Sequence, residues 1–523
     1  MLLPIFLLSL FTNYQNMVNG ANILALMNIP SPSHSLWNTI LVNALANRGH
    51  NLTVLISDLP KNPKDLHKNV HFIDMNDMYQ NLFNEADFES FLDISPLQMM
   101  SGYCMYNILV CEATLKSKGF SLFMEKYKNE KFDLILYDYT FGPCLLGLVH
   151  MYNYPPLISV SAFPYVPIAT KFTGGHFYPA YVSYHSVTWD PINNFLDRMH
   201  NHMLYAAEEL YRYYSMNPQL DKMIRPVFPA DTPYLADLEK LTTIALIGTH
   251  PAITKAQPLP QNIIEVGGLN IVDSQPLPKE LDSFINSSKK GAIFFSLGTN
   301  VQPKFVKSEM IENILKVMEK FPEYNFMWKF DVNLIKMKIP KNVLVQTFFP
   351  QRDILANKKT KCFITHAGGL STQEAIWFGV PMITVPVFVD QLRNSQKVVE
   401  DGIATEINFS KFTGESFHNA LNDILHNEKY INNIKKQSEI FKDRPMKPLD
   451  TAIWWIEYVL RHPNPTHLKV PTLELGYFIA NSYDFISIVL LIVIFILYVT
   501  IKIIKCICRG KARKTEKQKL KKK

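Results

Sequence analysis

The first stretch of the chain alternates apolar strands with a single amphipathic helix. Asn22–Met27 is apolar, and the polar loop Asn28–His34 separates it from Leu36–Ala46, where apolar positions recur with helical spacing. Gly49 ends this helix, and Leu52–Ile56 supplies the next apolar strand. A strand, a helix and a strand in this order predict a parallel βαβ unit.

The rest of the first half contains another strand and a long helical insertion. Leu134–Tyr137 is apolar and leads into a loop at Asp138. Between Phe172 and Ile244 strand patterns are sparse, whereas helical runs such as Phe195–Tyr214 are rich in Tyr, Met and Leu. We therefore expect an insertion made of helices.

Alternating elements begin again after a segment rich in proline and glycine. Pro258, Pro260 and Val266-Gly267-Gly268 predict a hinge. After Gly291, five apolar runs predict strands: Ile293–Leu297, Phe326–Phe330, Val343–Phe348, Cys362–Thr365 and Met382–Val385. Helical segments lie between several of them, so the pattern predicts two α/β domains, followed by an amphipathic helix at Leu449–Arg461.

Two apolar segments lie at the ends of the chain. Leu2–Phe11 is a short apolar run followed by small residues at Val18-Asn19-Gly20, which predicts a signal peptide over residues 1–20. A buried strand is the alternative, because no Lys or Arg precedes Arg48. Phe485–Ile501 has no formal charge and nearly spans a hydrocarbon core at 1.5 Å per residue, so it predicts one transmembrane helix.

The charge of the chain is concentrated in its tail. The 523 residues are 47% hydrophobic and 19% charged, as in folded proteins, and their net charge is +7. Lys502–Lys523 contains eleven Lys or Arg and one acid, a net of +10, so the rest of the chain carries −3. The body therefore gives no support for a nucleic-acid partner. Because basic flanks stay in the cytosol, the body is expected on the lumenal side.

Short motifs fit an anchored lumenal protein. Lys519 and Lys521 have the spacing of a dilysine signal for retrieval to the endoplasmic reticulum, although a basic tail that binds the membrane surface is the alternative. Cys506 and Cys508 lie beside the span, and their lipidation is left open. The six cysteines show neither a zinc-site nor a disulfide-scaffold spacing. Three asparagines begin N-glycosylation sequons: Asn51, Asn286 and Asn408.

The stretch from Phe363 to Pro381, FITHAGGLSTQEAIWFGVP, combines an apolar strand, a glycine turn and a helix from Leu370 onward. Glycines let a phosphate approach the backbone, and the first N–H groups of a helix, with its dipole, bind anions. His366 can add a hydrogen bond, and the Glu374 carboxylate can accept protons from ribose hydroxyls. Taken alone, the pattern also fits a tight connection without a ligand.

This stretch resembles the signature of the UDP-glycosyltransferases, especially the membrane-bound animal enzymes of detoxification. The resemblance includes FPQRDIL from Phe349 before the stretch and Asp390-Gln391 after it. It extends over essentially the whole chain, through the mature N-terminus, Glu265–Gly268, Phe295–Thr299, Asp443–Pro445 and the tail. It implies an α/β fold of the GT-B type, with two facing Rossmann-like domains and a C-terminal single-pass transmembrane helix.

The resemblance also implies how the chain is divided. The segments are a signal peptide at 1–20, an acceptor-binding domain at 21–266, a UDP-sugar-binding domain at 267–448, a helix and membrane approach at 449–484, a transmembrane helix at 485–501 and a basic cytosolic tail at 502–523. The helical insertion of the first domain is expected to face the acceptor.

The donor site is implied residue by residue. Phe348 stands where the family has a tryptophan that stacks on uracil, and Gln351 matches a glutamine beside the base or ribose. The remaining donor contacts are His366, Gly368 and Ser371 with Ser296, Gly298 and Thr299 for the diphosphate, Glu374 for the ribose, and Asp390 with Gln391 for the sugar. The chain departs from the family pattern at Ala367, Leu370, Asn357 and Pro463-Asn464.

His34 and Asp138 are the predicted catalytic residues. Both follow predicted strands at the edge where parallel sheets bind ligands. A histidine can remove the acceptor proton and an aspartate can stabilise the imidazolium, and the resemblance assigns these roles. Taken alone, a bystander histidine beside a cap at Ser33 or Ser35 is the alternative. Direct displacement inverts the anomeric centre, and the lack of an Asp-X-Asp motif predicts no metal and no other cofactor.

The resemblance predicts an enzyme that moves a hexose from a UDP-sugar to small lipophilic acceptors with a hydroxyl group. Leu370–Gln373 resembles invertebrate glucosyltransferases, which favours glucose over glucuronate. A catalytically silent partner subunit and a lipid- or hormone-specific glycosyltransferase are the alternatives. The expected partners are the donor, the acceptor and the membrane of the endoplasmic reticulum, and an oligomer with itself or with relatives is left open.

Overall fold

The chain divides into two compact units, Met1–Lys469 and Val470–Lys523. The structure is a computed structural model that describes residues 20–60, 66–82, 94–164, 167–176, 178–185, 187, 189–299, 301, 303–387, 390–463 and 465–521. Apart from Gly20, the predicted signal peptide lies outside the described residues.

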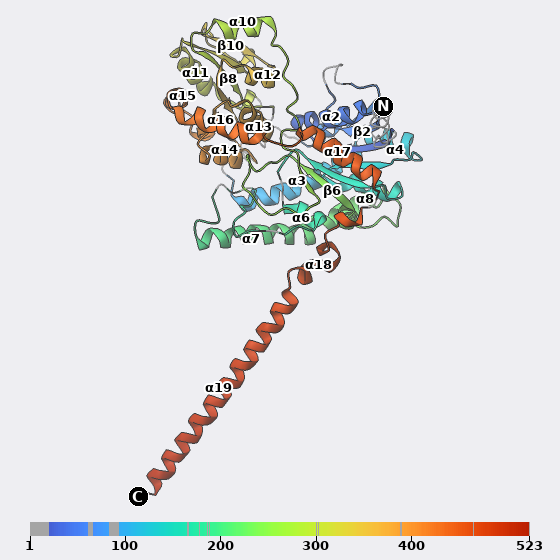
Figure 1. The fold of residues 1–523 in the computed structure, drawn as a ribbon, viewed down its shortest axis with the longest axis vertical. Coiled ribbons are helices and arrows are strands. Elements are labelled where there is room, and N and C mark those ends of the chain that lie inside the picture. Colours follow the sequence, from blue (N-terminus) through green and yellow to red (C-terminus); the bar gives the residue numbers. More distant parts are fainter. Residues whose placement is uncertain are drawn as a thin grey trace, which may run out of the picture. The chain divides into compact units, whose positions relative to one another are not determined.

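The first half of the larger unit is built around a seven-stranded parallel sheet in the order β3-β2-β1-β4-β5-β6-β7 (Figure 1). Its strands are β1 Asn22–Met27, β2 Asn51–Ile56, β3 Val70–Asp74, β4 Leu134–Asp138, β5 Leu157–Ser161, β6 Thr242–Ile247 and β7 Ile263–Glu265. The strand order reverses between β1 and β4, which makes the sheet a doubly wound, Rossmann-like one and places a switch point there.

Helices cover both faces of this sheet. Ile23, Ala25 and Met27 of β1 pack toward α2 Pro32–Asn47 on one face, whereas Leu24 and Leu26 join the core on the other. Because both faces are covered, β1 is apolar throughout rather than alternating. The helices around the second face are α3 Pro96–Lys116, α4 Lys118–Tyr127, α5 Gly147–Met151, α7 Phe195–Tyr211, α8 Asn217–Ile224 and α9 Leu235–Glu239.

The predicted insertion is helical. Among the described residues between Phe172 and Thr242, no strand occurs. Helix α6 Pro167–Thr173 leads into the insertion, and α7 continues through the π-helical turn η6 Arg212–Met216 into α8. Short 3-10 turns lie at η2 Asn76–Asn81 and η5 Pro143–Leu146.

The second half contains a six-stranded parallel sheet in the order β10-β9-β8-β11-β12-β13, again with a reversal between its first and fourth strands. Its strands are β8 Gly291–Ser296, β9 Tyr324–Lys329, β10 Val343–Gln346, β11 Thr360–Thr365, β12 Met382–Thr384 and β13 Ala404–Glu406. Its helices are α10 Lys279–Ser287, α11 Ser308–Glu319, α12 Gln351–Ala356, α13 Gly369–Phe378, α14 Asp390–Glu400, α15 Gly414–His426 and α16 Glu428–Lys442. Short 3-10 turns lie at η7 Pro303–Phe305, η8 Val332–Leu334 and η9 Phe409–Lys411.

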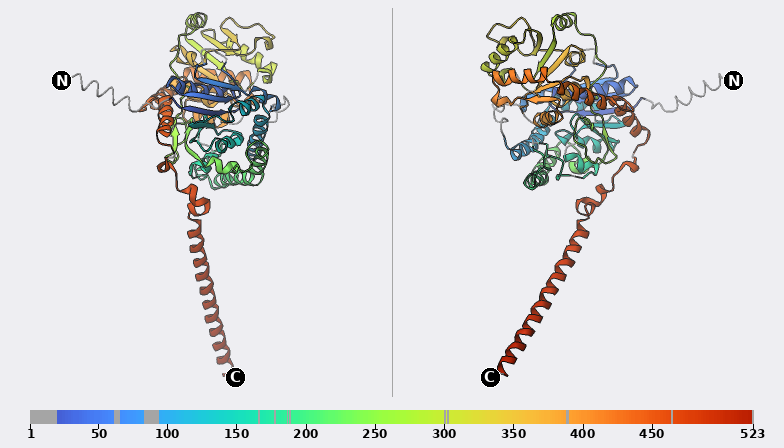
Figure 2. Two further views of the ribbon diagram at one scale, coloured as in Figure 1. Left: turned by 90° about the vertical axis from the view of Figure 1, so that its right-hand side faces the viewer. Right: turned by 60° about the vertical axis from the view of Figure 1, so that its left-hand side comes forward.

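The chain then returns to the first sheet. Helix α17 Pro448–Arg461 lies beside α2, and its buried residues Ala452, Ile456 and Val459 complete the core on that face (Figures 1 and 2). At its outer edge, Arg48 donates to the Glu457 carboxylate at 2.9 and 3.2 Å. The amphipathic helix predicted at Leu449–Arg461 is therefore a structural part of the first half, and η10 Thr466–Leu468 follows it.

One covalent link was not predicted from the cysteine spacing. Cys111 of α3 and Cys144 of η5 form a disulfide, with their Cα atoms 5.5 Å apart. They are separated by 33 positions in the sequence, and the fold brings them together because α3 packs against η5. The cysteine spacing shows no disulfide-scaffold pattern, and this single pair could not be predicted from it.

The smaller unit contains α18 Thr472–Ala480 and α19 Tyr483–Leu520. Within α19, Tyr483–Ala512 is long and apolar enough to cross a membrane. The transmembrane helix predicted at Phe485–Ile501 lies inside this segment.

Candidate active site

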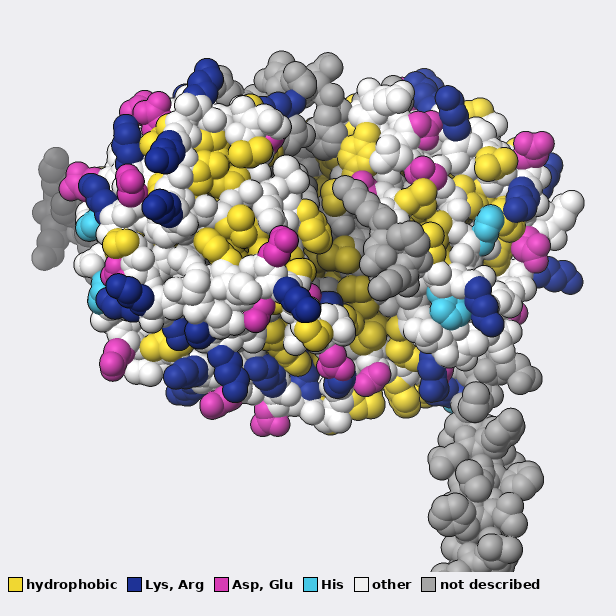
Figure 3. All heavy atoms as spheres, turned by 90° about the horizontal axis from the view of Figure 1, so that it is seen from above, with side chains coloured by type: hydrophobic (Ala, Val, Ile, Leu, Met, Phe, Trp, Pro, Cys, Tyr) yellow, Lys and Arg dark blue, Asp and Glu magenta, His cyan; other side chains and the backbone are white. Residues whose placement is uncertain are grey.

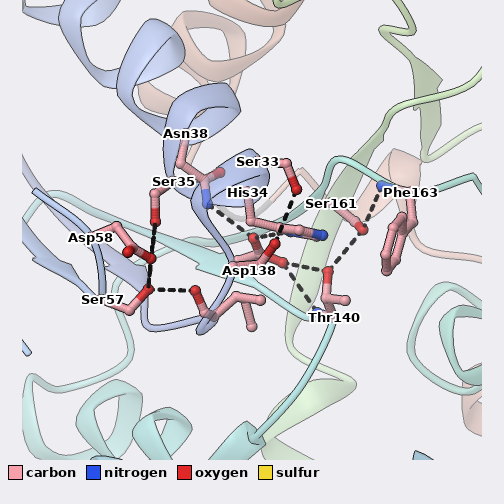
Figure 4. Close-up of polar contacts among 12 residues, drawn as sticks. Ser33, His34, Ser35, Asn38, Ser57, Asp58, Asp138, Thr140, Ser161 and Phe163 are labelled. Carbon is pink, nitrogen blue, oxygen red and sulfur yellow. Dashed lines mark hydrogen bonds and ion pairs between the residues drawn. The ribbon is translucent and has the colours of Figure 1, made fainter. Parts of the chain in front are cut away.

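The switch point of the first sheet brings two predicted residues together. Asp138 is the last residue of β4, and His34 lies in the first turn of α2, directly after β1. The His34 Nδ1 and Asp138 Oδ2 atoms are 3.1 Å apart (Figure 4). Because β1 and β4 are neighbours, their carboxyl ends present both side chains at one edge of the sheet.

The start of α2 differs from the expectation. The loop was predicted to run to His34, but the helix begins at Pro32, and its N-cap residue is Ser31. Proline fits the first helical position, because its missing N–H has no partner there anyway. Ser33 and Ser35 lie inside the helix, so neither caps it as in the bystander alternative, and His34 is held by helical backbone.

The Asp138 carboxylate is buried and has several donors. Asn38 Nδ2 donates to Oδ2 at 2.9 Å, and Thr140 donates to Oδ1 from its hydroxyl at 2.6 Å and its N–H at 3.2 Å. Burial alone raises the pKa of Asp138, but the charge of His34 and the hydrogen bonds from His34, Thr140 and Asn38 outweigh burial and lower it. Asp138 is therefore ionised near neutral pH.

The second ring nitrogen of His34, Nε2, lies on the edge of the ring that points away from Asp138. The ring meets Phe163 edge-on, with centroids 4.7 Å apart (Figure 4). Its Nε2 atom is buried and has no hydrogen-bond partner among the described residues. With Nδ1 held by Asp138, Nε2 is the nitrogen that can accept a proton from a bound molecule.

The switch point of the second sheet gathers the predicted diphosphate residues. Ser296 ends β8 and His366 follows β11, its neighbour. A Cβ atom at Gly298 or Gly368 would lie 2.4 or 2.5 Å from the His366 ring, so a side chain at either position would displace the ring. Gly298 also has a φ of +77°, which favours glycine. Burial, assisted by the charge of Lys329, lowers the pKa of His366 to about 4, and the ring is neutral at pH 7.

Helix α13 presents its N-terminus at the same point. Gly368 is the N-cap residue, and no side chain of the described residues caps the helix there. The N–H groups of the first turn, together with the helix dipole, therefore offer an anion site beside His366. Ala367 adopts a left-handed backbone with φ of +61°, the conformation that the glycine common in this position would adopt freely.

Glu374 lies one turn further along α13 and is buried among amide donors. Gln351 Nε2 donates to its Oε2 at 2.8 Å and to the Ser371 hydroxyl oxygen at 3.0 Å, and Asn270 Nδ2 donates to its Oε1 at 3.2 Å. Burial raises the pKa of Glu374 to about 7, although the hydrogen bond from Gln351 opposes the rise. The predicted ribose residues Gln351 and Glu374 thus form one cluster.

Asp390, a predicted sugar-binding residue, belongs to the second half of the larger unit. It is the first residue of α14, and its carboxylate accepts from Asn394 at 2.8 Å. Burial raises its pKa, while Asn394, the Gly369 N–H and the charge of His34 oppose the rise. The neighbouring Gln391 is buried, and its Oε1 accepts from the Val387 N–H at 3.0 Å.

Two predicted donor contacts lie on the surface. The Phe348 ring is 73% exposed and Thr299 is exposed, so both are available to a ligand. A space-filling view shows a hollow between two lobes of the body, with hydrophobic side chains gathered inside it (Figure 3).

Comparison with known proteins identifies the group to which the chain belongs. The family model described as "UDP-glucoronosyl and UDP-glucosyl transferase" matches residues 25–519. The chain is a member of this family of UDP-glycosyltransferases. UDP-glucosyltransferase 2 of Dactylopius coccus is 31% identical over 475 residues, which cover 88% of either chain. UDP-glucuronosyltransferase 2B17 of Homo sapiens is 31% identical over 490 residues, covering 92% of this chain and 88% of the human one.

Solved structures place this UDP-glycosyltransferase in the GT-B fold. UDP-glucose: anthocyanidin 3-O-glucosyltransferase in complex with UDP matches with a TM-score of 0.55 at 16% identity, over 85% of this chain and 99% of the other. The glycotransferase of kitacinnamycin has the same TM-score and identity over 84% of this chain and all of the other. The predicted fold, two Rossmann-like domains with an apolar C-terminal helix long enough to span a membrane, is confirmed.

Several residues of this UDP-glycosyltransferase site were not predicted. Asn38 lies four positions after His34 on the same helix, and this spacing was the available signal, because i and i+4 side chains share a helix face. Thr140 lies two positions after Asp138, so its contact is a local turn of the chain. Asn270 carries no comparable signal, since only the fold brings it to Glu374. Gln373 holds the joint between the two halves, accepting from Gly268 N at 2.6 Å and donating to Gly248 O at 2.9 Å.

The predicted glycosylation sites all lie on the surface of the larger unit. Asn51 begins β2, Asn286 lies in α10 and Asn408 precedes η9, and each is exposed. Their accessibility permits modification, which remains a prediction. Lys519 and Lys521, the predicted retrieval signal, lie at the end of the smaller unit.

Proposed function

We propose that this UDP-glycosyltransferase transfers a hexose, most readily glucose, from a UDP-sugar to a hydroxyl group of small lipophilic acceptors, with inversion at the anomeric carbon. The observation that carries the proposal is the His34–Asp138 pair, 3.1 Å apart at the edge of the first sheet and beside Phe163, which lines one cavity together with Asp390 of the second half. An acid–base pair that faces the donor half supports chemistry at their junction. It also argues against a catalytically silent subunit.

His34 acts as the general base. Its Nε2 takes the acceptor hydroxyl proton as the acceptor oxygen forms a bond to the anomeric carbon. The bond from that carbon to the phosphate oxygen breaks, and the electron pair leaves with UDP. Asp138 holds Nδ1–H, fixes the tautomer and stabilises the imidazolium that forms. A single displacement converts an α-linked donor into a β-glycoside.

The departing diphosphate is stabilised by the chain itself. The uncapped N-terminus of α13 and the neutral His366 supply N–H donors where negative charge develops on UDP. Ser296 at the end of β8 and Thr299 three residues later add hydroxyl groups from the neighbouring strand. These donors do not require a metal. We expect transfer to continue without added divalent cations and in the presence of EDTA.

The rest of the donor is held by the other predicted residues. Phe348 stacks on the uracil, Gln351 and Glu374 bind the ribose hydroxyls, and Asp390 with Gln391 binds the hexose. Glucose is favoured because Leu370–Gln373 resembles invertebrate glucosyltransferases and because one relative is named a UDP-glucosyltransferase. The human relative is named a glucuronosyltransferase, so glucuronate is the competing donor.

We further propose that the protein is a single-pass type I protein of the endoplasmic reticulum membrane that acts in detoxification. The apolar segment of α19 and the basic tail support this orientation. The Cys111–Cys144 disulfide gives independent support, because disulfides persist in oxidising compartments such as the lumen.

The test uses microsomes that contain the full chain. They are incubated without added metal with UDP-glucose, UDP-galactose or UDP-glucuronate and a panel of phenols and alcohols, and products are identified by mass and by anomeric configuration. Replacing the general base, His34→Ala, should lower transfer by about 10²- to 10⁴-fold while UDP binding persists. His426→Ala, at an exposed helical histidine, is the matched control.

The outcomes separate the parts of the proposal. If transfer persists in His34→Ala, His34 is not the general base. An α-linked product would exclude a single displacement. UDP binding without transfer to any acceptor would favour the silent subunit.

A further inference from the structure

A cavity between the two halves of the larger unit lies beside Phe163, the ring that meets His34. Residues of both halves line it, among them Tyr103, Phe163, His185, Glu208, Asp390 and Arg393. Phe163 is the ring that meets His34, and Asp390 is the carboxylate influenced by the charge of His34. The cavity therefore lies next to the His34 ring, across Phe163, and reaches Tyr205 and Glu208 of α7 in the helical insertion, where we expect the acceptor.

His185 is the unusual group in this cavity. Both of its ring nitrogens are buried, and neither has a hydrogen-bond partner among the described residues. Its ring packs between aromatic neighbours, with centroids 5.2 Å from Tyr103 and 4.3 Å from Tyr184. A buried polar group without a partner is disfavoured. Since the ring lines the cavity, a molecule bound there can supply both hydrogen bonds.

The charged groups near His185 are already engaged. The Glu208 carboxylate accepts from the Tyr184 hydroxyl at 2.6 Å and lies 3.7 Å from the Arg212 guanidinium. Arg393 donates to the carbonyl oxygens of Ser183 and Tyr184 at 2.5 and 3.2 Å. These contacts position the wall of the cavity and leave the His185 nitrogens to a ligand.

The chemistry of His185 restricts what it can bind. Burial lowers its pKa, although Glu208 opposes this, so the ring is neutral at neutral pH and carries one N–H donor and one lone pair. A hydroxyl group, which both donates and accepts, matches either nitrogen. The neutral ring offers an anionic group no positive charge, and the cations of the lining, Arg393, Lys255 and Lys397, are already paired within the chain. The surrounding Tyr103, Phe163 and Tyr205 favour a flat or ring-shaped apolar skeleton.

We propose that His185 is a specificity-determining residue that binds a second hydroxyl group of the acceptor, remote from the hydroxyl that His34 deprotonates. The inference rests on the proposed function and names its substrate class, which is lipophilic ring compounds with at least two hydroxyl groups. A mono-hydroxylated analogue leaves the His185 nitrogens buried without partners, and a site built to bind a hydroxyl discriminates strongly against such an analogue.

The experiment compares matched acceptors that differ by one hydroxyl. Full-length protein in microsomes receives UDP-glucose with 4,4′-dihydroxybiphenyl or 4-hydroxybiphenyl, and with dihydroxylated and monohydroxylated stilbenes and steroids. For at least one pair, the wild type should show at least a tenfold higher kcat/KM for the diol, after correction for equivalent hydroxyls. In His185→Phe the ratio should fall to about one through a higher KM for the diol.

Two further variants make the result specific. His185→Gln keeps a donor and an acceptor and should retain part of the preference, whereas His202→Phe, on the exposed face of α7, should retain all of it. Binding of UDP-glucose by each variant reports that it is folded. A wild type without preference, or a preference that persists in His185→Phe, would overturn the inference while leaving the proposed function intact. A wild type that glycosylates no acceptor would overturn the proposed function itself.

Discussion

Two carboxylates of the site are both buried yet differ in protonation, because their partners differ. Asp138 faces the His34 ring and receives donors from Asn38 and Thr140, and its pKa is lowered. Glu374 receives only amide donors as its direct hydrogen bonds, and burial raises its pKa to about 7. The first is thus a permanent anion, whereas the second gains its charge near neutral pH.

This difference predicts a pH dependence of donor binding. If Glu374 accepts protons from the ribose hydroxyls, it has to be ionised, and with a pKa of about 7 about one molecule in ten is ionised at pH 6. The affinity for UDP-glucose, measured by calorimetry without an acceptor, should therefore rise about tenfold from pH 6 to pH 8. Glu374→Gln should bind more weakly and lose this dependence. A wild-type affinity that is flat over this range would remove Glu374 from the ribose site.

Replacing glycine by alanine should change the free energy of unfolding in opposite directions at two positions. Gly379 ends α13 with φ of +70°, and an added Cβ would have no neighbour closer than 4.0 Å, so Gly379→Ala tests backbone conformation alone. We expect a loss of about 1 kcal/mol in the free energy of unfolding. Gly102 lies exposed inside α3 with nothing near its Cβ position, so Gly102→Ala should gain about 0.5–1 kcal/mol. Equal thermal midpoints for the two variants would contradict this account.

At the scale of elements, the sequence predicted most strands of the second sheet but only three of the first. Strand β1 was predicted with its exact bounds, and the predicted ends of β2, β4 and strands β8 to β12 differ from the observed ones by at most two residues. Strands β3, β5, β6, β7 and β13 were not predicted. Several of these are short or carry polar residues, such as Thr242 and Thr243 in β6, and they become strands through pairing with a formed neighbour.

The site residues that were predicted from the sequence also lie where the local pattern is strong. His34, Asp138, His366 and Glu374 lie directly after strands or at a helix start, so local pattern and family resemblance located them. The lining of the acceptor cavity was beyond sequence analysis, because His185 lies in the irregular insertion and meets Tyr103 only through tertiary packing.

The disulfide between α3 and η5 predicts a redox-dependent stability. Closing a loop of 33 positions stabilises a fold by about 3–4 kcal/mol in the chain-entropy account. The double variant Cys111→Ala with Cys144→Ala should unfold at a correspondingly lower urea concentration. Dithiothreitol should destabilise the wild type and leave the double variant unaffected. A wild type indifferent to reductant would show that the link contributes nothing.

At the scale of the whole molecule, α17 ties the end of the body to its beginning through Glu457. Burial raises the pKa of this carboxyl, but the hydrogen bond and charge of Arg48, followed by His50 and Arg461, outweigh burial and lower it from 4.5. A lowered carboxyl pKa stabilises the folded state above the unfolded pKa, and this contribution is lost as the pH falls through the lower folded value.

Glu457→Gln should therefore destabilise the body by about 1–3 kcal/mol at pH 7, since hydrogen bonds to charged groups are lost. The difference from the wild type should shrink as the pH falls below 4.5. Urea unfolding across this range measures it, with Glu319→Gln at an exposed helix end as control. A difference that is constant with pH would mean that the charge of Glu457 is irrelevant.

The return of α17 also sets the order of events on the ribosome. Ala452, Ile456 and Val459 seal one face of the first sheet, but they are synthesised only after every strand of the second sheet. The half that emerges first therefore completes its core last, and during translation its face around α2 stays open to chaperones. A chain terminated anywhere between β7 and α17 would display that uncovered apolar face permanently, which is the feature that quality control in a folding compartment detects.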